Sequence, residues 1–177
     1  MRRRIFPLIA FLCLLSAYPA ASQTIPALKA KALDDSDVSL PKPSAQQVDI
    51  LIIGFSKKSG ALCQPWAKHV STELLLDPRV NYYQIAHLEG VPSLIKPMIL
   101  HGMRNDMNSA QQAHMVPVYE KQDEWKKLVN FSAPDDAYIV LTDPNGRVFW
   151  QFHGPFSDSA YGELKKALSN LLQKSPG

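Results

Sequence analysis

Cysteine is almost absent from this sequence: only Cys13 and Cys63 occur among its 177 residues. Cys13 lies inside an apolar N-terminal run that we expect to be removed during export. The mature chain then keeps Cys63 alone, which excludes both an intramolecular disulfide and a dithiol redox pair. Because an exported protein meets an oxidising compartment, a single thiol there is either buried and inert or paired with another molecule.

Residues 1–22 lack acidic side chains and have the pattern of a signal peptide. Three arginines, Arg2–Arg4, precede the apolar run Ile5–Tyr18, and the small residues Ala20–Ser22 suit a cleavage site. The run is shorter than the roughly 20 residues of a spanning helix. We therefore predict cleavage near Gln23, export to the bacterial periplasm or the extracellular medium, and no stable membrane span. An uncleaved membrane anchor is the alternative.

An excess of one charge is missing from the mature chain. The full sequence has 19 Lys and Arg against 16 Asp and Glu, which gives a formal net charge of +3. Three of the arginines lie in residues 1–22, so the remaining chain has 16 residues of each sign and no formal net charge. Without a basic excess we expect no nucleic-acid partner.

Motifs for ligands and cofactors are missing too. We find no phosphate-binding loop, no nucleophilic-serine motif and no paired carboxylates at persuasive positions. No two of the five histidines stand at metal-ligand spacing, and one cysteine cannot complete a site with them. These histidines are His69, His87, His101, His114 and His153. We predict that the protein binds no metal and no cofactor.

The sequence that remains divides into two parts. Residues 23–46 contain three prolines and the acidic cluster Asp34–Asp37 without a sustained apolar period, so we expect a flexible lead-in segment. Residues 47–174 have the size of one ordinary domain.

Alternating apolar periods over residues 47–174 predict strands and helices in turn. Strands are expected at Val48–Phe55, Val80–Leu88, Met115–Tyr119, Ala137–Thr142 and Arg147–His153, and helices at 65–76, Pro92–Asn105, around Trp125–Val129, and from Ser157 or Asp158 through Leu171. The tetrapeptide Asp143–Gly146 is a strong turn signal between the last two strands. This order predicts an α/β three-layer sandwich whose mixed central sheet ends in an antiparallel hairpin.

Four segments of the chain point to one family. They are Gly54–Lys57, Leu100–Arg104, Asp136–Leu141 and Asp143–Gly154. The region from about Val48 to Leu172 resembles the mitochondrial ATP synthase assembly factor family of the thioredoxin-like superfamily, together with its bacterial relatives. Gly102–Arg104 is the most specific element of this resemblance.

The resemblance implies a thioredoxin-like fold with an extra helix and strand inserted before the C-terminal hairpin, in a protein without the usual dithiol. The mitochondrial members act as assembly chaperones for a membrane subunit of ATP synthase. The export signal of this chain departs from that setting. We therefore expect only the general role, which is non-covalent help to an envelope protein.

Cys63 stands where a thioredoxin-like protein has the second cysteine of its redox pair, and Gly60 occupies the place of the first. We expect Cys63 at the start of a helix, where the helix dipole together with Lys57 and Lys58 favours a thiolate. A thiolate would allow mixed disulfides or peroxide reduction. The other interpretation is a small apolar side chain packed under the loop. One-cysteine peroxidases usually have a threonine at the Gly60 position and a proline in the same loop, and this chain has neither.

Two further positions bear on whether Cys63 is a reactive thiol and on whether the protein binds a partner. Thioredoxin-like redox sites need a cis-proline that faces the cysteine, and the corresponding position here is Ala137, with Pro134 three residues too early. Arg104, after Met103 at a predicted helix end, either clamps a carboxylate or binds a partner. Alternatively it stabilises the helix terminus or pairs with Asp106.

We therefore predict an exported binding or assembly factor without catalytic activity, whose partner is a protein of the cell envelope. The candidate partner-binding residues are Lys57, Gly60, Met103, Arg104 and Ala137. The alternative is a monothiol redox protein, of the thiol-disulfide or peroxiredoxin-like type, in which Cys63 is the catalytic residue.

Overall fold

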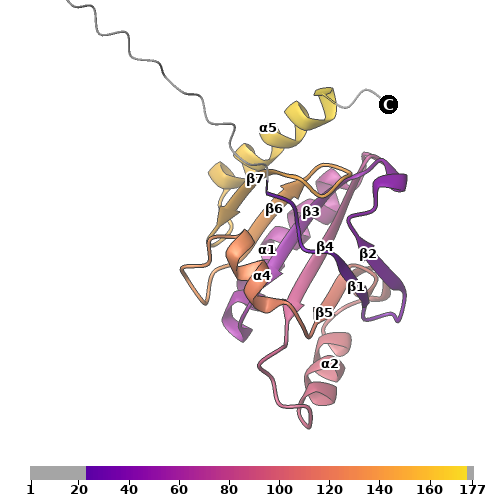
Figure 1. Ribbon diagram of the computed structural model, residues 1–177, viewed down its shortest axis with the longest axis vertical. Helices are drawn as coiled ribbons and strands as arrows, with labels where there is room; N and C mark the ends of the chain where they lie inside the picture. The colour runs from indigo at the N-terminus through magenta and orange to yellow at the C-terminus, as the bar shows by residue number, and fades with distance from the viewer. Residues whose placement is uncertain (1–22, 175–177) are drawn as a thin grey trace, which may run out of the picture.

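The computed structural model describes residues 23–174 of the chain and contains a five-stranded mixed sheet in the order β5-β4-β3-β6-β7 (Figure 1). Its strands are β3 (Val48–Gly54), β4 (Val80–His87), β5 (Met115–Val118), β6 (Tyr138–Thr142) and β7 (Val148–His153). Strands β3, β4 and β5 are parallel, whereas β6 is antiparallel to both β3 and β7. A separate two-stranded hairpin consists of β1 (Leu28–Lys31) and β2 (Asp37–Leu40).

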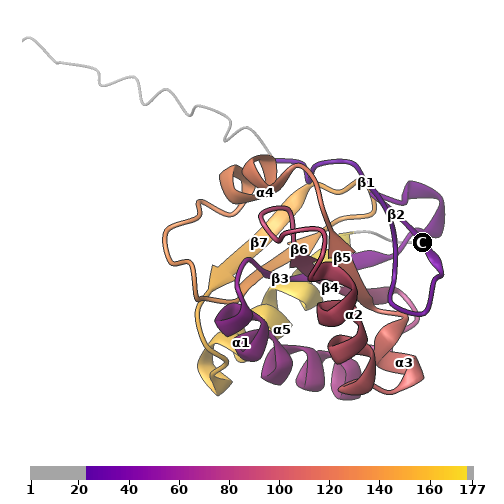
Figure 2. The ribbon, with the colours of Figure 1, turned by 90° about the horizontal axis from the view of Figure 1, so that it is seen from below.

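Helices and the hairpin cover the two faces of the sheet. The helices are α1 (Lys57–His69), which widens into a π-helical turn at Val70–Leu74, α2 (Lys96–Asn105), α3 (Ser109–Gln112), α4 (Gln122–Leu128) and α5 (Asp158–Lys174), and a short 3-10 turn spans Pro43–Ala45. Figure 2 shows α1 and α5 on one side of the sheet, and α4 with the β1–β2 hairpin on the other. This is the layered architecture that the sequence predicts.

Strand β3 lies at the centre of the sheet because its side chains can be buried: all are apolar except that of Asp49, which accepts a hydrogen bond. All seven residues are buried, as expected for a strand covered on both faces. Ile50 and Ile52 face the α1/α5 core, which is centred on Trp66 and Tyr161. Leu51 and Ile53 face the opposite way, into the hairpin/α4 core, which includes Leu28, Leu40 and Trp125.

The predicted turn between the last two strands is present. The Gly146 N–H donates to the Asp143 carbonyl at 2.9 Å, and Gly146 has a φ of 77°. A Cβ at this position would lie 2.8 Å from Cβ of Pro41. The turn therefore needs glycine for its backbone conformation and for its close approach to the segment that precedes β3.

The prediction of a flexible segment at residues 23–46 is wrong, because these residues form part of the domain. Leu28, Val38 and Leu40 are each at most 5% exposed and pack into the hairpin/α4 core. The four-residue strands are too short to show a sustained period, and the acidic cluster between them forms a tight turn in which Asp34 Oδ1 accepts from the Ser36 N–H at 3.0 Å. The domain thus includes residues that precede residue 47. The predicted signal peptide, residues 1–22, lies outside the described residues.

Two predicted helix starts are also wrong. Helix α1 begins at Lys57 instead of Pro65, because Ser56 and Ser59 cap each other: the Ser59 N–H donates to Ser56 Oγ at 3.0 Å, and the Ser56 N–H donates to Ser59 Oγ at 2.9 Å. Serine in place of the usual Glu or Gln hides this capping box in the sequence. Pro65 lies inside the helix on its exposed side. Helix α2 begins at Lys96, four residues after its predicted start.

Candidate functional site

Cys63 lies in the middle of α1, not at its start. It is the seventh residue of the helix and only 4% exposed. Its side chain packs in the α1/α5 core with Trp66, and its Sγ is 3.5 Å from the point where a Cβ on Gly54 would stand. The helix dipole acts within the first turn, so the predicted stabilisation of a thiolate does not apply to this position.

The electrostatic surroundings of Cys63 favour the protonated thiol. Burial raises the pKa of the Cys63 thiol to about 12. The two lysines expected to help are exposed at the start of α1, and Lys58 pairs instead with Asp135 at 3.2 Å. At neutral pH the side chain is a thiol surrounded by apolar groups, which is a poor nucleophile.

Gly60 and Ala137, the two positions that replace the usual redox residues, differ in their surroundings. Gly60 is half-buried in α1, and an added Cβ would meet no atom within 4 Å. Ala137 is fully buried just before β6 in the same core as Cys63. The Ala137 carbonyl accepts from the Gly154 N–H at 2.9 Å. Because this carbonyl already has an internal partner, the backbone at Ala137 does not offer a free acceptor for a bound chain.

Arg104 connects α2 to the β1–β2 hairpin. Its Nε donates to the Leu33 carbonyl at 2.9 Å, and an Nη lies 3.5 Å from a carboxylate oxygen of Asp35. The expected partner Asp106 is not among its ion pairs within the described residues. Met103, the neighbouring candidate residue, is half-buried. Arg104 therefore has a structural role as well as a place on the surface.

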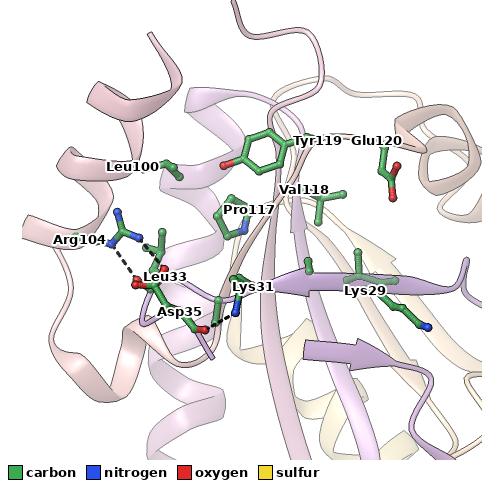
Figure 3. A pocket seen from close by; sticks show the side chains of 13 residues that line it. Lys29, Lys31, Leu33, Asp35, Leu100, Arg104, Pro117, Val118, Tyr119 and Glu120 are labelled. Atoms are coloured by element: carbon green, nitrogen blue, oxygen red, sulfur yellow. Dashed lines mark hydrogen bonds and ion pairs between the residues drawn. The ribbon is translucent and has the colours of Figure 1, made fainter. Parts of the chain in front are cut away.

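A cleft of about 460 Å³ opens beside Arg104, between α2, β1 and the end of β5 (Figure 3). Its lining combines apolar side chains with charged ones at the rim. The lining residues are Leu28–Leu33, Asp35, Leu100, Arg104 and Pro117–Glu120. The sequence does not reveal this cleft, because one of its walls is the β1–β2 hairpin, in the segment expected to be flexible.

The predicted site residues do not form one site. Cys63 and Ala137 share the α1/α5 core. Lys57 is exposed on the first turn of α1. Of the predicted residues, Arg104 is the one that lines the cleft.

His87 is a buried titratable group for which the sequence predicts no role. Its ring stacks on Phe55 with centroids 4.9 Å apart and lies 5.8 Å from the ring of Trp125. The side chain is 5% exposed, and neither ring nitrogen has a hydrogen-bond partner. Burial, with a smaller contribution from Lys126, lowers the pKa of His87 to about 4, so the ring is neutral at neutral pH.

Asp49 is a second buried titratable group. It is 6% exposed at the start of β3 and accepts from Asn81 Nδ2 at 3.3 Å. Burial raises its pKa to about 6, and the Asn81 bond opposes this shift. In the sequence it is one polar residue in an apolar strand, which carries no signal of function.

Within residues 23–174, no three His, Cys, Asp or Glu side chains come together in a way that could hold a metal ion. None of the helices in the same part of the chain has both the length and the apolarity to cross a membrane.

No family model matches the sequence, and no curated protein matches it. Solved structures with the same fold include a member of the Sco family of cytochrome c oxidase assembly proteins, at 14% identity, with 83% of this chain and 94% of that chain covered and a TM-score of 0.55. The pneumococcal exposed lipoprotein thioredoxin from Streptococcus pneumoniae has 10% identity, 80% and 98% coverage, and a TM-score of 0.54. A putative thiol:disulfide interchange protein DsbE from Chlorobium tepidum has 14% identity, 85% and 96% coverage, and a TM-score of 0.54.

These similarities confirm that the chain has a thioredoxin-like fold, an α/β structure with a mixed five-stranded sheet flanked by helices. At this level of identity they concern the fold alone, which hosts many unrelated functions.

Proposed function

We propose that this protein is a thioredoxin-like binding module that works without thiol chemistry and assists a protein partner in the cell envelope. The observation that carries the proposal is the position of Cys63. It is buried in the middle of α1 with its pKa raised to about 12, and the residues described contain no second cysteine. A redox role needs an accessible thiolate, and these surroundings oppose one.

The cleft beside α2 supports a role in binding. Leu100 and Arg104, the two ends of the segment that resembles the ATP synthase assembly factor family, both line it. One of the structures with this fold belongs to a protein of cytochrome c oxidase assembly, so the fold is compatible with assembly work as well as with disulfide exchange. The envelope setting rests on the signal-peptide pattern of residues 1–22.

Turnover assays test the proposal directly. We expect the purified protein to reduce neither the disulfides of insulin nor hydrogen peroxide above the background rate, and the Cys63→Ser variant to behave in the same way. A known thioredoxin serves as the positive control for the insulin assay and a known peroxidase for the peroxide assay. Turnover that disappears in Cys63→Ser would overturn the proposal and establish the monothiol enzyme in its place.

A further inference from the structure

The cleft beside α2 exists because two strands begin to pair and then stop. The Leu33 N–H, just after β1, donates to the Met115 carbonyl at the start of β5 at 2.9 Å. From this contact β1 runs back to Leu28 while β5 runs on to Val118, so the two strands are antiparallel. Within the described residues this is the one backbone hydrogen bond between the hairpin segment and β5.

Pro117 explains why the pairing ends. The carbonyls of His114 and Val118 accept hydrogen bonds from the N–H groups of Gln84 in β4 and of Leu88 just after it, at 2.8 and 2.7 Å. Backbone groups alternate in direction along a strand, so Met115 and Pro117 face away from β4 and toward β1. Proline has no N–H to donate, and an edge proline is a common device against further strand pairing. The ladder therefore stops after Met115 and leaves the cleft open.

The facing edge of β1 keeps its pairing capacity. The Ala32 N–H donates to the Ser36 carbonyl at 2.9 Å, so the backbone of Ala32 faces the β2 side of the hairpin. By the same alternation the N–H and C=O groups of Lys29, Lys31 and Leu33 face β5, as the bond from Leu33 confirms. The backbone groups of Lys29 and Lys31 on this edge have no backbone partner in the described chain.

The lining of the cleft has one more positive than negative side chain: Lys29, Lys31 and Arg104 against Asp35 and Glu120. Lys31 is paired with Asp37 at 3.1 Å, outside the lining. Arg104 contacts Asp35 at 3.5 Å, which is long for a hydrogen bond, and the Asp35 side chain is 79% exposed. A planar guanidinium in this position can accept a further carboxylate. The Lys96 ammonium lies 4.7 Å from the centre of the Tyr119 ring at the other end of the cleft.

We propose that the cleft binds an extended segment of a partner protein, in which acidic residues alternate with apolar ones, by strand addition to the free edge of β1. The segment's backbone pairs with Lys29 and Lys31, as in other cases of strand addition. Its apolar side chains contact Leu100 and Tyr119, and its carboxylates lie near Arg104. This inference rests on the proposed function as a binding module and names the chemistry of the partner.

Exposed apolar side chains also occur on α2, in the loop before it and at Tyr119. Leu94, Ile95 and Met98 are 91, 41 and 70% exposed, and Tyr119 is 40% exposed. Figure 1 shows α2 projecting beyond the end of the sheet, and none of its residues is buried. A group of exposed apolar side chains of this kind marks an interaction surface.

Short labelled peptides test the proposal. One peptide alternates valine with glutamate, a second replaces glutamate with lysine, and a third carries N-methyl groups on the edge of the acidic peptide that pairs. We expect the acidic peptide to bind the full chain at least about tenfold more tightly than either of the others. In NMR spectra its binding shifts the amide signals of Lys29, Lys31 and Tyr119.

Two variants locate the binding. Leu100→Trp fills the cleft and Lys31→Glu reverses a charge at its edge, and we expect each to weaken the acidic peptide about tenfold or more. Leu76→Trp is the matched control, because Leu76 is 82% exposed outside the cleft, and it leaves binding unchanged. Circular dichroism and the melting temperature of each variant verify that it folds.

Several results would overturn the proposal: equal binding of the acidic and lysine peptides, amide shifts elsewhere on the protein, or no binding of the acidic peptide. Binding to anionic phospholipid vesicles through Leu94 and Met98, without peptide binding, would identify a membrane as the occupant instead. These outcomes are separate from the turnover assays, which decide whether the protein is an enzyme whichever peptide it binds.

Discussion

At the scale of single residues, three buried groups lead to predictions about thiol reagents and pH. Cys63 is a core side chain that fills space beside Trp66 and Gly54. Burial lowers the pKa of His87 and raises the pKa of Asp49, so it disfavours the charged form of each side chain. None of the three faces the cleft.

The pKa shifts of Asp49 and His87 predict opposite effects of pH on stability. The pKa of Asp49 is raised from 3.8 to about 6 in the folded protein, so its contribution is fully present below pH 3.8 and is lost as pH rises through about 6. The pKa of His87 is lowered from 6.5 to about 4, so its contribution is present above pH 6.5 and is lost as pH falls toward 4.

Urea unfolding of Asp49→Asn and His87→Phe between about pH 4 and pH 7 tests both shifts. We expect Asp49→Asn to raise the free energy of unfolding relative to wild type by up to roughly 3 kcal/mol at pH 7, and the advantage to vanish near pH 4. The free energy of unfolding of His87→Phe, relative to wild type, instead increases by up to roughly 3 kcal/mol as pH falls from 6.5 to 4. Differences from wild type that do not change with pH would contradict the two shifts.

At the scale of elements, the β1–β2 hairpin is part of the folded core. Val38 is 5% exposed, whereas its neighbour Ser39 points into solvent. We expect Val38→Asp to lower the free energy of unfolding by about 3 kcal/mol or more, because it places an unpaired charge in the hairpin/α4 core. Ser39→Asp is the matched control and changes stability by no more than about 0.5 kcal/mol. Equal effects of the two substitutions in urea unfolding would show that the hairpin is not packed on the sheet.

The turn between β6 and β7 depends on Gly146 in a way that α1 does not depend on Gly60. Gly146→Ala places a Cβ at 2.8 Å from Pro41 with a φ of 77°, and we expect it to cost at least about 2 kcal/mol. Gly60→Ala meets open space inside a helix and raises stability by up to about 1 kcal/mol. Thermal unfolding of both variants measures this contrast, and a neutral Gly146→Ala would mean that the turn tolerates a side chain.

At the scale of the whole molecule, the residue that suggests catalysis and the surface that suggests binding are in different layers. Cys63 belongs to the α1/α5 core on one face of the sheet. The cleft is bounded by β1, whose Leu28 packs into the hairpin/α4 core on the other face. The burial of Cys63 in α1 therefore places no constraint on binding at the cleft.

Most of the sheet could be predicted from the sequence, because long apolar runs such as Val48–Gly54 bury both faces of a strand. The hairpin could not, since each of its strands has four residues and the acidic turn dominates the segment. The start of α1 was missed because serine stands at both capping positions. Because this start was missed, Cys63 was expected in the first turn of a helix instead of its second turn. The prediction of a stabilised thiolate depended on that position.

The cleft was beyond prediction for a related reason. Its two walls, at Leu28–Leu33 and Pro117–Glu120, are far apart in the sequence and meet through tertiary packing. Arg104 was singled out from the family resemblance, but its partners Leu33 and Asp35 belong to the segment that was expected to be flexible.

The burial of Cys63 is tested most directly by the pH dependence of its alkylation with iodoacetamide in the folded protein, followed by mass spectrometry. We expect negligible labelling of the folded protein through about pH 9, while the urea-unfolded protein reacts with a midpoint near the free-thiol pKa of about 8.5. Labelling of the folded protein with a midpoint at or below about 8.5, as fast as that of the unfolded chain, would show that Cys63 is an accessible and reactive thiol.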